Sequence, residues 1–266
     1  MPLPGSTAKK TEPTEDISAH VTRIRFMGCP VDALDMAQTI RRIEEFIRDR
    51  KPRQHVVVNA AKLVEIQGDE ELRQIICSCD LINADGMPIV WASRLLGTPL
   101  PARVAGSDLF QNLVRVCAEK GYRPFFFGAR QWVVERVVEV FKARYPALDV
   151  AGFRNGYYSE EEEPGIAEMI RDSKADILFV GFSSPKKEKF LRKWMSVMQV
   201  PFSMGVGGSF DVIAGLTKRA PLWMQNCGLE WFYRFLQEPR RLWKRYLTTN
   251  SVFVYLLIKE LLKNRV

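Results

Sequence analysis

Residues 81–96 read LINADGMPIVWASRLL, and this stretch contains the unit on which the fold prediction rests. Leu81–Ala84 is a short apolar segment typical of a buried strand, and Asp85 and Gly86 follow it as a turn. Pro88 then opens a helix that is expected to run to Leu96. Because Gly86 allows a close backbone approach, the stretch predicts a strand, a tight turn and a helix in direct succession.

The same succession recurs along most of the chain. Short apolar or β-branched runs predict strands over Thr22–Met27, His55–Asn59, Leu81–Ala84, Pro124–Phe127, Asp149–Gly152, Ile177–Val180 and Phe202–Val206. Amphipathic stretches predict helices over Met36–Arg50, Glu70–Cys79, Pro88–Leu96, Ser107–Lys120, Trp132–Tyr145, Glu160–Ser173 and Pro185–Met198. This alternation predicts an α/β fold, a mostly parallel, Rossmann-like sheet with helices on both faces. Ligands bind such sheets at the carboxyl ends of the strands.

The sequence divides into three parts. Residues 1–19 are rich in Pro, Thr, Lys and Glu and are expected to form a flexible tail. Residues 20–216 are the expected α/β core, and residues 217–266 are an expected basic, helical appendage. The appendage holds ten Lys or Arg and three Glu, a net charge of +7 out of +8 for the whole chain. Only the appendage is therefore suited to an anionic surface.

The appendage is expected to lie on a membrane without crossing it. Its apolar run, Ser251–Ile258, is shorter than the roughly 20 residues that span a bilayer. An interfacial helix is predicted from the spacing of Leu256, Leu257, Leu261 and Leu262 with Lys259 and Lys263. The head of the chain lacks the apolar stretch of a signal peptide, which places the protein in the cytoplasm, on the inner face of the cell membrane.

Several classes of site are disfavoured by what the sequence lacks. His20 and His55 are too few for a zinc site or a Ser-His-Asp triad. The cysteines are odd in number and are expected to be reduced, buried thiols, although Cys77 and Cys79 could touch a metal; they are Cys29, Cys77, Cys79, Cys117 and Cys227. Neither a GxGxxG motif nor a P-loop is present. No two aspartates are separated by a single residue, so the Asp-x-Asp metal clamp of many sugar transferases is missing and no metal site is expected. In a group-transfer reaction, the charge of the leaving group would then be met by Arg, Lys and backbone amides.

Asp85 and Arg103 are the candidate catalytic residues. A carboxylate at a strand-to-helix turn can act as a general base toward a sugar hydroxyl, but Asp85 could equally be an N-cap of the next helix. The guanidinium of Arg103 suits a diphosphate, although a surface arginine is the plainer interpretation. Ser107 or Asp108 could cap the helix that follows.

Glycines at later strand ends and arginines of the appendage are candidate substrate-binding residues. Gly128 follows one strand, and the Gly205–Asp211 stretch, with Gly207 and Gly208, could crowd backbone amides around an anion or a base ring. Arg234, Arg241 and Arg245 are spaced to share one helical face, which would either complete the site or form a solvated basic face.

The order of these motifs resembles the WecG/TagA/CpsF family of glycosyltransferases. The resemblance covers about residues 22–247 and rests on NADGMPIVW at 83–91, RVAGSD at 103–108, PKKEK at 185–189, GVGGSFD at 205–211, KRAP at 218–221 and LEWFYRFLQEPRR at 229–241. It implies inverting, metal-independent transfer of a sugar from a UDP-sugar to a polyprenyl-diphosphate-linked saccharide, in synthesis of a surface polysaccharide or a teichoic-acid-type polymer. It also implies a membrane-docking appendage.

The resemblance further implies roles for particular residues. Asp85 would be the catalytic base and Arg103 would help to hold the diphosphate. The expected substrate-binding residues are Asn59, Asn83, Gly106, Asp108, Gly128, Lys187, Glu188, Gly207, Gly208, Asp211, Arg234 and Arg241. Two departures concern the donor: the family often has Thr-Pro-Asn where this chain has Val57-Val58-Asn59, and Gln where it has Lys187. The donor is therefore left open among N-acetylmannosamine, its uronic acid and another hexose.

The expected partners are a UDP-sugar, the lipid-linked saccharide and an anionic membrane surface, with no cofactor and no nucleic acid. Homo-oligomerisation is left open. Two other functions are weighed: a nucleotide-sugar oxidoreductase, which the missing GxGxxG disfavours, and a non-catalytic protein that binds membrane surfaces.

Overall fold

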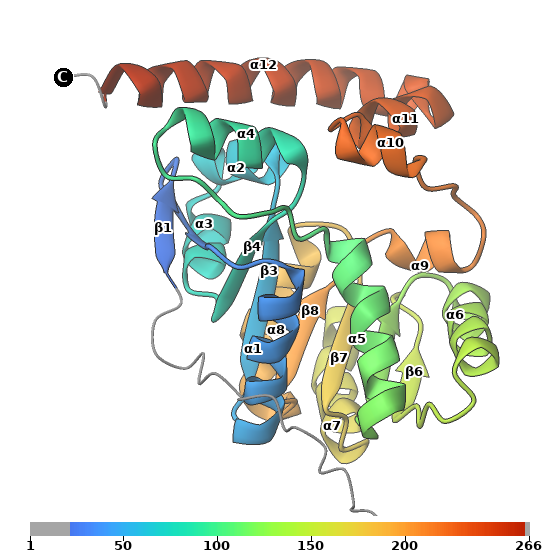
Figure 1. The fold of residues 1–266 in the computed structure, drawn as a ribbon. Helices are drawn as coiled ribbons and strands as arrows, with labels where there is room; N and C mark the ends of the chain where they lie inside the picture. Colours follow the sequence, from blue (N-terminus) through green and yellow to red (C-terminus); the bar gives the residue numbers. More distant parts are fainter. Residues whose placement is uncertain (1–21, 264–266) are drawn as a thin grey trace, which may run out of the picture.

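The computed structural model describes residues 22–263, and the tail predicted over residues 1–19 lies outside them. Within this part of the chain, six strands form one parallel sheet (Figure 1). Its order is β4 (Leu81–Ala84), β3 (Arg53–Val58), β8 (Phe202–Gly205), β7 (Ile177–Gly181), β5 (Pro124–Gly128) and β6 (Gly152–Arg154). The predicted α/β fold class is confirmed.

Alternating side chains of the strands face two layers of helices. Phe126 packs among residues of α1 (Met36–Asp49), α5 (Gly106–Lys120) and α6 (Gln131–Arg144). Its neighbours Phe125 and Phe127 point the other way, toward α7 (Glu163–Asp172) and α8 (Lys186–Met198). At the other end of the sheet, β3 and β4 pack in the same way on α2 (Ala60–Gly68) and α3 (Glu70–Cys77). Since side chains alternate along a strand, an apolar strand of this kind is buried on both faces.

The first predicted strand does not join the main sheet. Residues 22–27 contribute β1 (Arg23–Phe26), which pairs antiparallel with β2 (Cys29–Asp32). Met27 and Gly28 both have positive φ, the geometry of a tight two-residue hairpin. The Asp32 carboxylate holds the hairpin against β4, because it accepts a hydrogen bond of 2.8 Å from the Ile82 amide.

Within residues 22–263, four helices follow the last strand. They are α9 (Ser209–Ile213), α10 (Leu222–Asn226), α11 (Glu230–Gln237) and α12 (Pro239–Lys263), and α12 lies across α2 and α4 (Met87–Leu95) at the carboxyl edge of the sheet (Figure 1). Phe253 of α12 is buried, and Leu256 and Leu257 pack against the same core cluster. The prediction of a helical appendage is confirmed, but Leu256 and Leu257 turn toward the protein and not toward a membrane. In residues 22–263, no helix is long and apolar enough to cross a membrane.

A buried polar chain links β3, β4 and α1. His55 is 2% exposed, and its Nε2 lies 3.0 Å from the Asn83 side-chain oxygen. The Asn83 amide group in turn donates to the Thr39 hydroxyl at 3.1 Å. Burial lowers the pKa of His55 to about 4, and the hydrogen bond with Asn83 offsets only part of that effect. The folded protein therefore holds His55 neutral at pH values where an unfolded chain would protonate it.

Because of this difference in pKa, the folded protein becomes less stable as the pH decreases. Between about pH 6.5 and pH 4 the unfolded chain binds the extra proton, so the free energy of unfolding decreases as the pH falls. We expect His55→Gln to remove about 2 kcal/mol of the decrease between pH 7 and pH 5, whatever its effect at pH 7. Urea denaturation of both proteins at the two pH values measures this, and equal decreases would contradict it.

Candidate functional site

Asp85 stands one residue beyond β4 at the carboxyl edge of the sheet. Its amide donates to the Val58 carbonyl at 2.8 Å, which locks its backbone to β3. The N-cap of α4 is Gly86, with φ of 102°, and that helix has no side-chain cap. The interpretation of Asp85 as an N-cap is therefore wrong, and its half-buried carboxylate is not used for capping.

The surroundings of Asp85 favour its protonated form more than water does. Burial and the nearby charge of Glu230 raise the pKa of Asp85 to about 6. The Asp108 carboxylate acts in the same direction, while the Arg103 charge and a hydrogen bond from the Gly106 amide act against it. A carboxylate with a pKa near the working pH combines ionisation with appreciable basicity, as a general base requires.

Four charged side chains next to Asp85 form a closed ring of alternating sign, which we call the charge ring (Arg103, Asp108, Arg219 and Glu230). Arg103 Nη1 lies 3.4 Å from Glu230 Oε2, and its Nη2 lies 3.8 Å from Asp108 Oδ2. Arg219 pairs with both oxygens of Asp108, and its Nε lies 3.4 Å from Glu230 Oε1. Arg103 also donates to the Gln225 side chain at 3.0 Å. The ring joins the core to the appendage.

The ring also corrects a prediction about α5. That helix begins at Gly106 with Ala105 as its N-cap and has no side-chain cap, so neither Ser107 nor Asp108 caps it. Asp108 instead faces Arg219. A side chain at position 106 would press on Val57 of β3, so Gly106 lets the start of α5 approach the sheet.

The glycine-rich turn after β8 lies against α11, the helix of the appendage that also carries Glu230. A Cβ atom on Gly208 would lie 3.4 Å from Nη2 of Arg234 and 3.9 Å from Oδ2 of Asp211. The neighbouring Gly207 has φ of 52°, a left-handed conformation that glycine adopts without strain. Because Glu230 and Arg234 are one helical turn apart, α11 bridges from the charge ring to this turn.

The three appendage arginines do not share one helix. Arg234 belongs to α11, which ends before Glu238, and Arg241 and Arg245 belong to α12, which starts at Pro239. The prediction of one continuous helical face is therefore wrong, since the backbone of Glu238 leaves the helical conformation between them. The side chains of Arg241 and Arg245 lie outside the described residues.

Lys187 and Glu188 belong to a buried group beneath β3 and β8. Glu188 is 2% exposed and pairs with Lys62, and Lys187 Nζ lies 3.4 Å from the same oxygen of Glu188. The stem of Lys187 crosses the backbone of Gly205, where any side chain would collide with it. The two lysines lower the pKa of Glu188 despite its burial. Burial and the neighbouring charge of Lys62 lower the pKa of Lys187.

Three predicted residues make structural contacts of their own, although Asn59 directly follows Val58, whose carbonyl accepts the hydrogen bond from the Asp85 amide. Asn59 is exposed and caps α2, since its side chain accepts a 2.9 Å hydrogen bond from the Lys62 amide. Asn83 is fully buried in the polar chain with His55. Gly128 packs on the backbone of Gly181, which leaves no room for a Cβ atom. The local role visible for each is structural.

Sequence reasoning missed Lys62, Arg219, Gln225 and Glu230. The helix that carries Lys62 was not predicted, so its pairing with Glu188 had no basis in the pattern. Arg219 and Glu230 stand inside the KRAP and LEWFYR segments, so the signal was present although neither was singled out.

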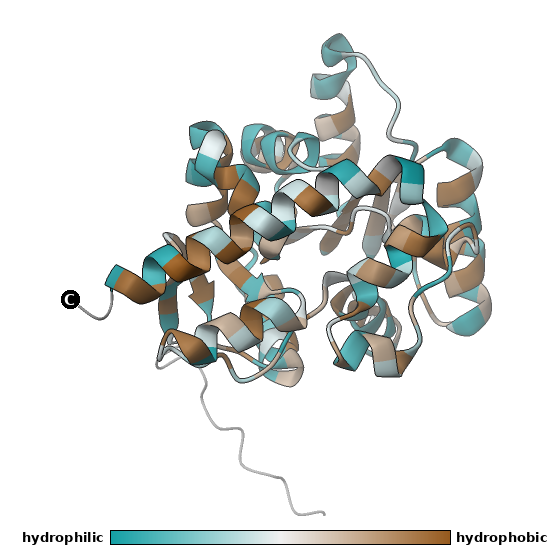
Figure 2. Ribbon diagram, turned by 90° about the horizontal axis from the view of Figure 1, so that it is seen from above, coloured by the Kyte–Doolittle hydropathy of each residue, from teal (hydrophilic) through white to brown (hydrophobic). Residues whose placement is uncertain are grey.

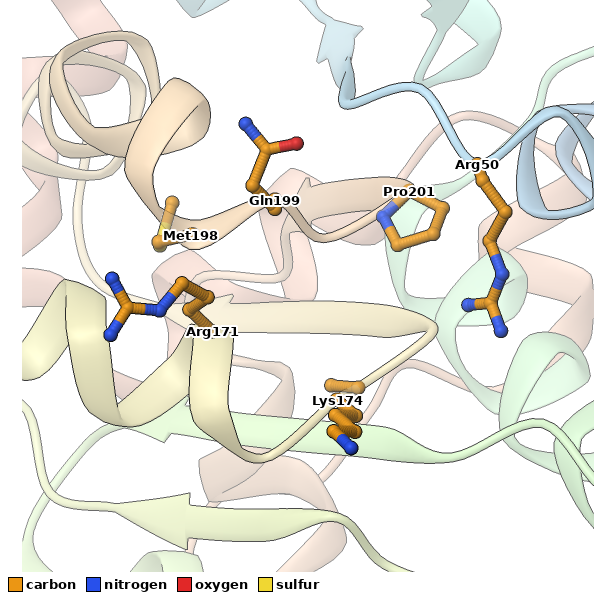
Figure 3. Close-up of a pocket in the computed structure, with 7 residues that line it drawn as sticks. Arg50, Arg171, Lys174, Met198, Gln199 and Pro201 are labelled. Carbon is orange, nitrogen blue, oxygen red and sulfur yellow. The ribbon is translucent and has the colours of Figure 1, made fainter.

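A cavity of about 260 Å³ lies at the opposite edge of the sheet, where β7 and β8 begin. Figure 3 shows that the guanidinium groups of Arg50 and Arg171 lie at opposite sides of this cavity and do not converge. Arg50 is engaged with Asp176, and Arg171 with Asp172. This cavity therefore does not offer the convergent cations that a diphosphate needs.

No group of three or more His, Cys, Asp or Glu side chains within residues 22–263 is arranged to hold a metal ion. The cysteines Cys29, Cys77, Cys79, Cys117 and Cys227 are all free thiols, and Cys227 is exposed.

The half-buried Asp85 carboxylate and the arginines lie at the carboxyl edge of this parallel sheet, the edge at which open α/β sheets bind their ligands. The chain belongs to the glycosyl transferase WecG/TagA/CpsF family, whose sequence model matches residues 24–266. The expected family and enzyme class are thus confirmed.

Two relatives are named as N-acetylglucosaminyldiphosphoundecaprenol N-acetyl-beta-D-mannosaminyltransferases. The protein of Bacillus spizizenii strain W23 is 38% identical over 174 residues, which is 65% of this chain and 66% of that protein. The protein of Bacillus subtilis strain 168 is 36% identical over 192 residues, 72% of this chain and 74% of that protein. The aligned parts thus span about two thirds and three quarters of the two relatives.

The coupling energy of the ion pair that joins core and appendage can be measured with a double-mutant cycle on Asp108 and Arg219. This bidentate pair is largely shielded from solvent. We therefore expect a coupling energy of about 1–2 kcal/mol from urea denaturation of the wild type, the Asp108→Ala and Arg219→Ala variants and the double variant. The exposed pair of Arg115 and Glu119 on α5 is the matched control and should give about 0.3–0.5 kcal/mol. Equal coupling in the two cycles would contradict this role of the charge ring.

Proposed function

We propose that this chain transfers N-acetylmannosamine, or a close relative of it, from a UDP-sugar to a polyprenyl-diphosphate-linked saccharide. The observation that carries the proposal is Asp85, a half-buried carboxylate beside Arg103 at the carboxyl edge of the sheet, with its pKa raised to about 6. The names of the two relatives support the sugar and the lipid-linked acceptor. Lys187, where the family often has Gln, keeps the uronic acid and other hexoses in consideration as donors.

The proposed reaction is a single displacement with inversion. The Asp85 carboxylate takes the proton of an acceptor hydroxyl, and the oxygen forms a bond to the anomeric carbon of the donor. The bond between that carbon and the phosphate oxygen breaks on the opposite face, and UDP leaves with the electron pair. One base suffices for this step, and the reaction needs no covalent intermediate on the protein.

Arginines and backbone amides are proposed to meet the charge of the departing UDP, without a metal ion. Arg103 lies near Asp85, and the Arg234 guanidinium lies close to the Gly208 backbone, in the turn after β8. Fixed cations aimed at developing charge stabilise a transition state because they need little reorganisation. Arg241 stays a prediction, as does a contribution from the buried pair of Lys187 and Glu188.

The appendage is proposed to hold the enzyme on the anionic inner face of the cell membrane. Exposed apolar side chains gather on its helices: Leu222, Trp223, Trp231, Phe232, Leu236, Trp243, Leu247, Val254, Tyr255, Ile258 and Leu262. Apolar residues recur along the whole of α12 when it is seen from above (Figure 2). Leu247, Ile258 and Leu262 are spaced to share the helix face opposite Phe253. Such a face suits a helix in the membrane interface.

Asp85→Asn should abolish transfer without unfolding the protein. An amide cannot take the proton, and loss of a positioned base costs roughly 10²–10⁴ in rate. The measurement is UDP release from UDP-N-acetylmannosamine with a short-chain, water-soluble acceptor. Asp172→Asn, the same change at an exposed site, is the control. Retention of more than about a tenth of wild-type turnover by Asp85→Asn would show that Asp85 is not the base.

Membrane docking should depend on the exposed face of α12. We expect the triple change Leu247→Ser, Ile258→Ser and Leu262→Ser to weaken binding to anionic vesicles roughly tenfold or more, since burial of such side chains contributes over 1 kcal/mol each. Transfer to the water-soluble acceptor should persist. The control replaces Trp132, Tyr157 and Met169, exposed side chains of the core, with Ser. Equal co-sedimentation of both variants with vesicles would refute the docking face.

A further inference from the structure

Glu230 is shared between two arginines that come from different parts of the chain. It is the first residue of α11, and its side chain is 31% exposed. One carboxylate oxygen lies 3.4 Å from Arg103 Nη1, and the other lies 3.4 Å from Arg219 Nε. Both distances exceed those of a strong charged hydrogen bond, whereas Asp108 holds Arg219 closely with both of its oxygens. Glu230 is thus the more loosely held carboxylate of the charge ring.

The place of Glu230 is fixed by the turn that precedes it. Gly228, between α10 and α11, has φ of 67°, and a Cβ atom there would lie 2.8 Å from the Trp91 ring and 3.2 Å from the Met87 side chain. Met87 and Trp91 belong to α4, which begins two residues after Asp85. The start of α11 is therefore seated on the helix that Asp85 introduces, and this contact delivers Glu230 to the neighbourhood of the base.

The four charges of the ring cancel one another before substrate binds. Asp85 is influenced by Glu230 from α11, by Asp108 from α5 and by Arg103 from the preceding loop, and Arg219 pairs with both carboxylates of the ring. Two arginines and two carboxylates cancel, so Asp85 adds one uncompensated negative charge. An incoming diphosphate is attracted by Arg103 and repelled by Glu230, so it would replace Glu230 as the partner of Arg103.

We propose that Glu230 is a positioning residue supplied by the appendage, which holds the guanidinium of Arg103 beside Asp85 until the donor diphosphate replaces it, and which keeps a negative charge close to the Asp85 carboxylate. This inference rests on the proposed function. Glu230 touches neither the reacting hydroxyl nor the leaving group and acts through Arg103 and Asp85. Since its charge is one of the causes that raise the pKa of Asp85, Glu230 helps to set the pH at which the base becomes ionised.

The test is the pH profile of kcat/KM with UDP-N-acetylmannosamine and the water-soluble acceptor. In the wild-type enzyme the acid limb should lie near pH 6, where Asp85 ionises. Glu230→Gln keeps an oxygen for Arg103 but removes the charge, so the limb should move down by about one pH unit. Glu230→Asp should restore it toward the wild-type position. Glu260→Gln, the same charge change at the far end of the appendage, should leave it in place.

A second measurement does not depend on activity. Titration of the Asp85 carboxyl carbon by ¹³C NMR, in the full-length protein without substrate, should show the same downward shift in Glu230→Gln. Superimposable profiles and titrations of wild type and Glu230→Gln would overturn the inference, as would an equal shift in Glu260→Gln. A wild-type enzyme that transfers no sugar, or an Asp85→Asn variant with full activity, would instead overturn the proposed function.

Discussion

The alternating ring of Arg103, Asp108, Arg219 and Glu230 is the contact on which the candidate site depends, because it joins the sheet to the helices that follow it. Partly buried charges lose much of their hydration, and they are tolerated when each finds a partner of opposite sign. Each ion pair between core and appendage in this ring joins one residue of the core to one residue of the appendage. The core contributes Arg103 and Asp108 at the edge of the sheet, and the appendage contributes Glu230 and Arg219.

Placement of α11 by this ring explains the rest of the site. One turn of helix separates Glu230 from Arg234, which carries a guanidinium group to the glycine turn after β8. Asp85 lies between buried strands and these charges, so burial and Glu230 together raise its pKa to about 6. A base and two cations at one edge of a parallel sheet suit the removal of a hydroxyl proton and the departure of a diphosphate.

Local patterns predicted the sheet class, the strand-end position of Asp85 and most strands of the sheet, because alternation and turn chemistry act over a few residues. They placed one strand over Asp149–Gly152, whereas β6 spans Gly152–Arg154. They could not show that residues 23–32 form a separate hairpin, since strand pairing is a tertiary choice. They also placed Arg234, Arg241 and Arg245 on one helix, although the backbone breaks at Glu238. The partners of Arg103 were invisible for the same reason: Glu230 lies 127 residues away, and only the fold brings the two together.

We propose that the substrate binds where the core and the appendage meet. A crystal structure of the full chain with UDP-N-acetylmannosamine and a short-chain acceptor tests it most directly. We expect the diphosphate within hydrogen-bonding distance of Arg103 and the acceptor hydroxyl within hydrogen-bonding distance of the Asp85 carboxylate. A donor bound at the opposite edge of the sheet, in the cavity beside Arg50 and Lys174, would contradict it.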